Sequence, residues 1–133
     1  DTKRFSNSSF VNHVDGEKIS VQAVKLDNQG ITDIGFLKVD VEGFELAVLN
    51  GAEQIINRDL PTCMVEIYYK FNQGPVEDTF LFFTDKYYKM FYNIKGNGLK
   101  EIQSIQEAVD VSLDEKMIED HDGDFLFVNS TNR

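Results

Sequence analysis

The stretch IGFLKVDVEGFELAVLNGAEQII, residues 34–56, changes its hydrophobic pattern at Gly43. Residues 34–41 form a nearly continuous apolar run, which is typical of a strand covered on both faces in a parallel sheet. After Gly43 the apolar residues recur on one helix face, which predicts a helix over residues 44–57 that ends before Pro61. Residues 63–68 predict another buried strand. This order of strand, helix and strand is the βαβ signature of a parallel sheet.

The N-terminal and middle segments predict further elements of one α/β domain. Residues 5–12 and 19–26 predict two extended segments that are joined by an Asp-Gly turn. Pro75 predicts the start of a second helix, because proline is favoured in the first turn. Four aromatic residues then follow a helical spacing and are expected to belong to the core: Phe80, Phe83, Tyr87 and Phe91.

The C-terminal part predicts a hairpin, two short helices and a last strand. The turn at residues 95–98 has Asn-Gly at its centre, which is typical of a tight β-hairpin. Residues 104–107 and 112–115 each match a capping box and predict two helix starts. Residues 124–128 form a short apolar run that predicts a closing strand.

The acidic composition makes some partners poor candidates. The chain has 23 acidic and 13 basic residues, a formal net charge of −10. This charge repels phosphate backbones and anionic lipids, so we expect neither nucleic acid nor membrane binding. A single cysteine, Cys63, cannot form an internal disulfide and lies in an apolar run, which favours a reducing, cytoplasmic compartment.

The candidate site residues are acids at the carboxyl ends of the two predicted parallel strands, where open sheets of this type bind ligands. Asp40, Glu42 and Gly43 form the turn after the first strand, and Glu66 lies in the next strand. If these strands are neighbours, the carboxylates converge and could orient a hydroxyl, act as a general base or hold a cation. Glu45 is expected to stabilise the helix start.

Other metal signals are weaker. Neither histidine, His13 or His121, has a ligand partner at metal spacing, so no metal centre is predicted from them. Residues 119–124 are acidic, but they lack the ligand order and the closing Glu of a calcium loop.

A family resemblance rests on the phrase KVDVEGFE, residues 38–45, followed by VLNGA, residues 48–52, and by LPTCMVEIYY, residues 60–69. This combination resembles the FkbM family of S-adenosylmethionine-dependent methyltransferases. The segments FSNSSF and ISVQAVKLD before it and DFLFVN after it are also similar to that family, so the resemblance covers nearly the whole chain.

The resemblance implies a partial Rossmann-like sheet of the class I methyltransferases, mostly parallel with an antiparallel C-terminal strand and with helices on its faces. It implies that residues 1–133 are one domain, the C-terminal part of a methyltransferase domain without the N-terminal half that binds the cofactor. The chain is therefore expected to be an incomplete fragment.

The implied activity is methyl transfer from S-adenosylmethionine to an oxygen, such as a hydroxyl of a sugar or secondary metabolite. Asp40 would line the cofactor and acceptor cleft, and Gly43 would let the backbone turn tightly under the ligand. Glu42 and Glu66 would bind or deprotonate the acceptor, and Lys38 could pair with one of these acids.

Two alternatives stay open at this point. The chain could be a non-catalytic interaction module derived from a methyltransferase fold, or a cation-dependent hydrolase that uses Asp40, Glu42 and Glu66. A half-sheet should also expose an apolar edge, which predicts a homodimer or pairing with another chain.

Overall fold

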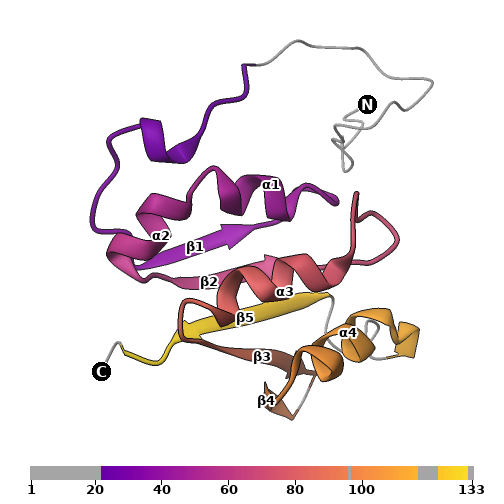
Figure 1. The fold of residues 1–133 in the computed structure, drawn as a ribbon. Coiled ribbons are helices and arrows are strands. Elements are labelled where there is room, and N and C mark those ends of the chain that lie inside the picture. The colour runs from indigo at the N-terminus through magenta and orange to yellow at the C-terminus, as the bar shows by residue number, and fades with distance from the viewer. Residues whose placement is uncertain (1–21, 96, 117–122, 132–133) are drawn as a thin grey trace, which may run out of the picture.

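The computed structural model describes residues 22–95, 97–116 and 123–131. They form a mixed α/β fold in which a five-stranded sheet has the order β1-β2-β5-β3-β4 (Figure 1). The strands are β1 (Phe36–Val39), β2 (Thr62–Glu66), β3 (Tyr88–Ile94), β4 (Gly98–Ile102) and β5 (Asp124–Asn129). The helices are the 3₁₀ helix η1 (Leu26–Asn28), α1 (Glu45–Asn50), α2 (Glu53–Asp59), α3 (Val76–Thr84) and α4 (Ile105–Leu113).

The prediction of a mostly parallel sheet is wrong, because among the described strands only β1 and β2 pair in parallel. Strand β5 lies between β2 and β3 and runs antiparallel to both, and β3 and β4 form an antiparallel hairpin. A helical crossover allows neighbouring strands to run parallel, whereas a short turn makes them antiparallel. The antiparallel direction of the C-terminal strand is confirmed.

One face of the sheet is packed under helices. Along β2 and β5, fully buried residues alternate with half-buried ones, as expected for one packed face and one more open face. The rings of Phe83 in α3 and Phe127 in β5 stack with their centroids 3.9 Å apart. Strand β1 is not covered on both faces as predicted, since Phe36 is 55% exposed.

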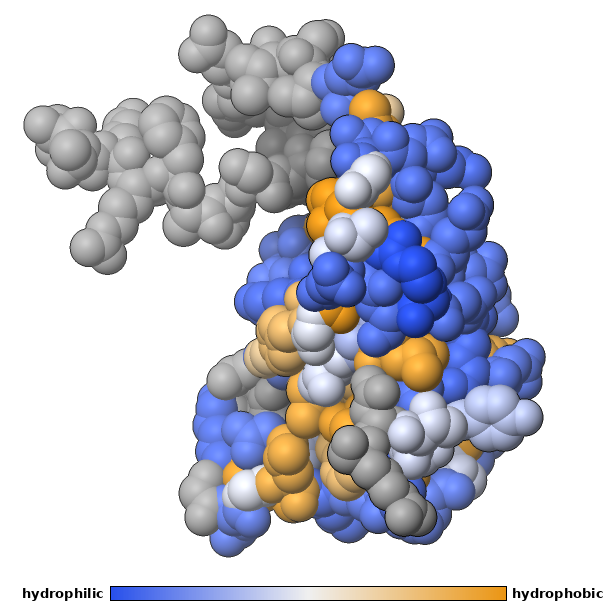
Figure 2. All heavy atoms as spheres, turned by 90° about the vertical axis from the view of Figure 1, so that its left-hand side faces the viewer, coloured by the Kyte–Doolittle hydropathy of each residue, from blue (hydrophilic) through white to orange (hydrophobic). Residues whose placement is uncertain are grey.

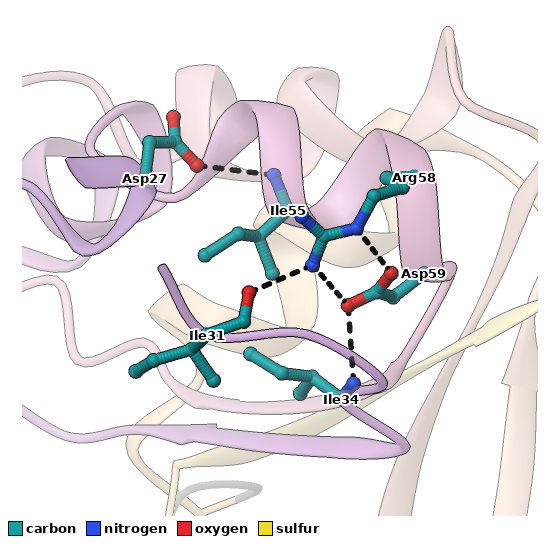
Figure 3. A network of polar contacts seen from close by, with 6 residues as sticks. All are labelled: Asp27, Ile31, Ile34, Ile55, Arg58 and Asp59. Atoms are coloured by element: carbon teal, nitrogen blue, oxygen red, sulfur yellow. Dashed lines mark hydrogen bonds and ion pairs between the residues drawn. The ribbon is translucent and has the colours of Figure 1, made fainter. Parts of the chain in front are cut away.

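The helix predicted over residues 44–57 is two helices, α1 and α2, which are separated at Gly51 and Ala52. Asp27 explains the break. Its backbone N–H donates to the carbonyl oxygen of Gly51. Its carboxylate accepts hydrogen bonds from the backbone N–H groups of Gln54 and Ile55, the second of which is drawn in Figure 3. A carboxylate from outside the helix therefore caps α2, a contact that the local pattern cannot indicate.

The predicted aromatic stripe is right for its first half and wrong for its second. Phe80 and Phe83 are fully buried in α3. The helix ends at Thr84, and Tyr87 lies in a turn with a left-handed φ of 62° and is 74% exposed. Phe91 belongs to β3, so its spacing from Phe83 reflects a change of element.

Further predictions near the termini have mixed outcomes. The β3–β4 hairpin and the cap of α4 are confirmed, with the Ser104 hydroxyl accepting from the N–H of Glu107. Ser112 does not cap the second predicted helix, because it lies inside α4 and its hydroxyl donates to the carbonyl of Val109. Residues 115 and 116 are helical, and the continuation lies outside the described residues. Residues 22–26 contain no strand, and the rest of the N-terminal hairpin prediction lies outside the described residues, as do His13 and His121.

The predicted acids lie at one end of the sheet. Asp40 follows β1 and Glu66 closes β2, and both strands end on the right of Figure 1. Seen from the opposite end, the surface has hydrophobic patches between larger hydrophilic areas (Figure 2).

Within the described part of the chain, no helix has the length and apolar character that crossing a bilayer requires.

Candidate functional site at the carboxyl ends of the parallel strands

The parallel pairing of β1 and β2 brings Asp40 and Glu66 together. Val39 pairs with Val65, so the next residues, Asp40 after β1 and Glu66 at the end of β2, are neighbours at the same edge of the sheet. Strand β5 starts at this edge, where Asp124 pairs with Glu66.

Glu42 completes a cluster of three acids. Each of Asp40, Glu42 and Glu66 has a carboxylate oxygen within 4.8 Å of such an oxygen on the other two. Glu42 joins them through a left-handed backbone, with φ at 54°, a conformation that costs a non-glycine residue free energy. The expectation that these carboxylates converge is confirmed, while their roles stay predictions.

The turn that carries Glu42 is held by Glu45 and by the loop after β2. Glu45 is 3% exposed, and one of its carboxylate oxygens accepts the backbone N–H groups of Val41 and Gly43, at 3.2 and 3.0 Å. Gly43 has φ at 98°, and a Cβ there would collide with the carbonyl oxygen of Phe71. The backbone N–H of Gln73 donates to the Gly43 carbonyl. Glycine is thus required by the packing of two loops.

The surroundings of Asp40 and Glu66 move the pKa values of these two acids in opposite directions. Desolvation by burial, with a hydrogen bond to Asp40 and the charges of Asp40, Asp124 and Glu42, raises the pKa of Glu66 to about 7. A hydrogen bond from Lys38, whose Nζ lies 3.1 Å from the carboxylate, lowers the pKa of Asp40. At neutral pH Asp40 is ionised, whereas Glu66 is present in both its protonated and its ionised form.

The predicted pairing of Lys38 with an acid of the site is confirmed by its contact with Asp40. The sequence analysis missed Asp124, although an acid that begins an otherwise apolar final strand was a usable signal. It also missed how the loop after β2 is fixed: Tyr69 donates a hydrogen bond to Glu115, and Lys70 forms an ion pair with Glu115 at 2.7 Å.

This arrangement has definite chemical capacities. An ionised carboxylate beside an acid with a pKa near 7 can accept hydrogen bonds from hydroxyl groups, attract a positive group and take up a proton. The three acids together also form the oxygen-only set that hard cations accept.

The fold and the site define the class of the protein: it is an α/β protein with an acidic site at the edge of the sheet where its two parallel strands end. A family model narrows this further. The family described as Methyltransferase FkbM domain matches residues 1–90, more than half of the chain of 133 residues. The chain therefore belongs to the FkbM methyltransferase family. No curated protein and no solved structure matches it.

Proposed function

We propose that this protein takes part in methyl transfer from S-adenosylmethionine to a hydroxyl oxygen of a sugar or secondary metabolite, with Glu66 as the general base. One arrangement carries the proposal: the carboxylates of Asp40 and Glu66 meet at the end of the parallel strands, where burial and like charge raise the pKa of Glu66 to about 7 and Lys38 lowers that of Asp40. A pair of acids whose pKa values are driven apart is the usual sign of different roles. A general base works best when its pKa lies near the working pH.

In this proposal Glu66 accepts the proton of the acceptor hydroxyl, and that makes the oxygen a better nucleophile. Lys38 stabilises the ionised form of Asp40, and the charge of Asp40 raises the pKa of Glu66. Glu42 orients the hydroxyl by accepting a second hydrogen bond. Positioning the acceptor is the larger part of such catalysis, since alignment of reactants replaces an unfavourable encounter.

The donor set fits the methyl donor that the family implies. S-adenosylmethionine carries a positive sulfonium and ribose hydroxyls, and ionised Asp40, exposed at the sheet edge, suits either group. When bound, S-adenosylmethionine would supply the methyl group for transfer. Asp40 is the residue proposed to hold it. Gly43 stays a predicted cofactor residue whose backbone N–H and carbonyl already have partners in the chain.

Calorimetric titration with S-adenosylhomocysteine tests the cofactor part. Binding at micromolar strength would mean that this chain forms a cofactor site, and Asp40→Asn should then weaken it at least tenfold while Glu66→Gln changes it by less than threefold. No binding by the wild type would mean that the cofactor needs residues beyond this chain. Asp85→Asn is the matched control, because Asp85 is an exposed acid that follows the last residue of α3 and does not belong to the acidic cluster. Equal binding by the wild type and Asp40→Asn contradicts the assignment of Asp40.

Transfer of labelled methyl from S-adenosylmethionine to a panel of hydroxyl-bearing sugars and secondary metabolites tests the base. Turnover should rise with pH through about 7, since only ionised Glu66 accepts a proton. Glu66→Gln should lower turnover about 100-fold or more and remove that pH dependence. A pH profile that is identical in the wild type and the variant rules out Glu66 as the base.

The remaining proposals concern partners and extent. Within the described sheet, β1 is an edge strand that carries the exposed Phe36. This supports pairing of that edge with a second copy or another chain, which sedimentation would show as a dimer. The C-terminal position of this chain in a larger methyltransferase domain, its cytoplasmic location and the lack of nucleic acid or membrane partners stay predictions.

A further inference from the structure

The turn that carries Glu42 has an unusual backbone. Glu42 and Gly43 both have left-handed φ values, 54° and 98°. Glycine adopts this conformation easily, but it costs a glutamate free energy, so it persists at position 42 only where neighbouring contacts fix it. The contacts that fix this turn therefore decide where the Glu42 carboxylate lies.

Glu45 supplies two of these contacts from inside the protein. Its side chain is buried, and a single carboxylate oxygen accepts the backbone N–H groups of Val41 and Gly43, the residues on either side of Glu42. Backbone N–H groups that converge in this way form a concave anion site, which is called a nest. The chain fills this nest with a carboxylate of its own.

Capping of α1 does not account for this contact. Phe44 is the N-cap of α1 and makes no side-chain cap hydrogen bond, and the Glu45 side chain turns back to N–H groups that precede the helix. In α4, by contrast, Glu107 reaches back to the N–H of Gln103 beside the N-cap, as in a capping box. Glu45 therefore orders the turn before its helix.

The loop after β2 fixes the other side of the same turn. The Gly43 carbonyl accepts the backbone N–H of Gln73, at 3.3 Å. This contact leaves the N–H groups of Val41 and Gly43 to Glu45. Without the Glu45 carboxylate these two N–H groups would need new partners, and the peptide groups that carry Glu42 would be free to rotate.

We propose that Glu45 is a positioning residue that holds the Glu42 carboxylate in the cluster with Asp40 and Glu66. The inference rests on the proposed function only for its effect on methyl transfer, because the convergence of the acids can be measured without a substrate. Glu45 acts through the position of one oxygen and not through its charge. Its second oxygen accepts no hydrogen bond from the residues that the structure describes, so an amide nitrogen in its place loses no contact.

Two variants separate position from charge. Glu45→Asp keeps the charge but draws the oxygen back by one methylene, whereas Glu45→Gln loses the charge and keeps an oxygen in place. Burial, the neighbouring Asp40 and the charges of Asp124 and Glu42 raise the pKa of Glu66. Carboxyl ¹³C titration should therefore show a lower apparent pKa of Glu66 in Glu45→Asp, and the wild-type value in Glu45→Gln. A wild-type value in Glu45→Asp, or a lowered value in Glu45→Gln, overturns the proposal.

Glu42→Gln shows whether Glu45 acts through Glu42. This variant removes the charge of Glu42 and should lower the apparent pKa of Glu66 at least as much as Glu45→Asp does. The double variant Glu42→Gln/Glu45→Asp should match Glu42→Gln alone, because the charge of Glu42 is already lost. Additive shifts of the two changes contradict the proposal.

Glu107→Asp is the matched control for a loss of stability. Glu107 also accepts a backbone N–H near a helix start, and it does not belong to the acidic cluster. Both Asp variants should lower the thermal midpoint, and only Glu45→Asp should move the titration of Glu66. An equal shift in Glu107→Asp assigns the effect to lost stability and rejects the proposal.

Should Glu45→Asp not fold, the wild type decides. Scalar couplings across hydrogen bonds should join the Glu45 carboxyl carbon to the backbone nitrogens of Val41 and Gly43. Both couplings support the proposal, and the absence of either one in a folded wild type rejects it.

Methyl transfer separates this inference from the proposed function. Glu45→Asp should lower kcat about tenfold through misalignment of the acceptor. It should keep the rise of turnover with pH, moved to slightly lower pH, since Glu66 remains the base. If the wild type transfers no methyl group to any acceptor, the proposed function fails, while the titration of Glu66 still decides the role of Glu45.

Discussion

Acids at the two ends of strand β1 have opposite environments. Before β1, Asp59 accepts hydrogen bonds from the backbone N–H of Ile34 and from Arg58, which also donates to the carbonyl of Ile31 (Figure 3). After β1, Asp40 has Lys38 as partner, and Glu66 meets other acids. The Arg58 guanidinium lowers the pKa of Asp59 to about 2, whereas burial among acids raises that of Glu66 to about 7.

This difference separates structure from function. The end that contains Asp59 satisfies its charge with a cation and backbone donors, which stabilises the fold. The end that contains Glu66 gathers like charges at a sheet edge, an arrangement that costs stability and that folding alone does not require. The comparison therefore favours the end of β1 with Asp40 and Glu66 as the place of chemistry.

Asp59→Ala should show the larger effect on stability. The variant leaves the N–H of Ile34 and the guanidinium of Arg58 without this acceptor, and we expect the thermal midpoint at pH 7 to fall by about 5 °C. Because the folded-state pKa is lowered, the contribution of Asp59 is present above its unfolded value near 3.8 and is lost as the pH falls toward 2. Calorimetry between pH 2 and 7 should show the gap to the wild type closing at low pH. A constant gap would mean that the charge is not what matters.

Glu66→Gln should change stability in the opposite direction, so that the variant is more stable than the wild type at neutral pH. The folded-state pKa of Glu66 is raised from 4.5 to about 7, so its stabilising effect is complete below pH 4.5 and is lost as the pH rises through 7. After allowance for solvent screening, we expect the variant to gain about 1–2 kcal/mol relative to the wild type between pH 5 and pH 8. Urea unfolding at both pH values measures this. An equal difference at the two pH values contradicts the raised pKa.

The sequence predicted the acidic site better than it predicted the sheet. Asp40 follows one apolar run and Glu66 ends the next, and a helical segment joins the two runs. Local pattern is enough to make such strands parallel neighbours. The position of β5 between β2 and β3 is set by contacts between residues distant in the chain, such as Cys63 with Phe127 and Met90 with Phe127. No local periodicity encodes that choice.

Two further misses have the same cause. The break between α1 and α2 depends on Asp27, which lies more than twenty residues before the helix that it caps. Helix α3 ends at Thr84, and Tyr87 adopts a left-handed φ in the turn that follows. The aromatic spacing of Tyr87 from Phe83 instead predicts a helix that continues through Tyr87. In both cases a tertiary contact or a turn overrides a correct periodic signal.

Lys38→Met should have the smallest effect and addresses the coupling within the site. Both Lys38 and Asp40 are about half exposed, so solvent screens their contact and we expect little change in stability. Loss of the cation removes the main cause that lowers the pKa of Asp40, so the pair should bind its first shared proton at higher pH. Carboxyl ¹³C titration should therefore show both apparent pKa values of the Asp40–Glu66 pair moving up by less than about one unit.

Lys89→Met is the matched control, because Lys89 forms a similarly exposed ion pair with Glu101 on the β3–β4 hairpin. It should leave both apparent pKa values of the Asp40–Glu66 pair where they are. If the two lysine variants shift the pair equally, the shift reflects net charge and not the Lys38–Asp40 contact. A shift that is confined to Lys38→Met shows that the contact with this exposed lysine lowers the pKa of Asp40. Glu66 is then left as the acid of the pair that exchanges its proton near neutral pH.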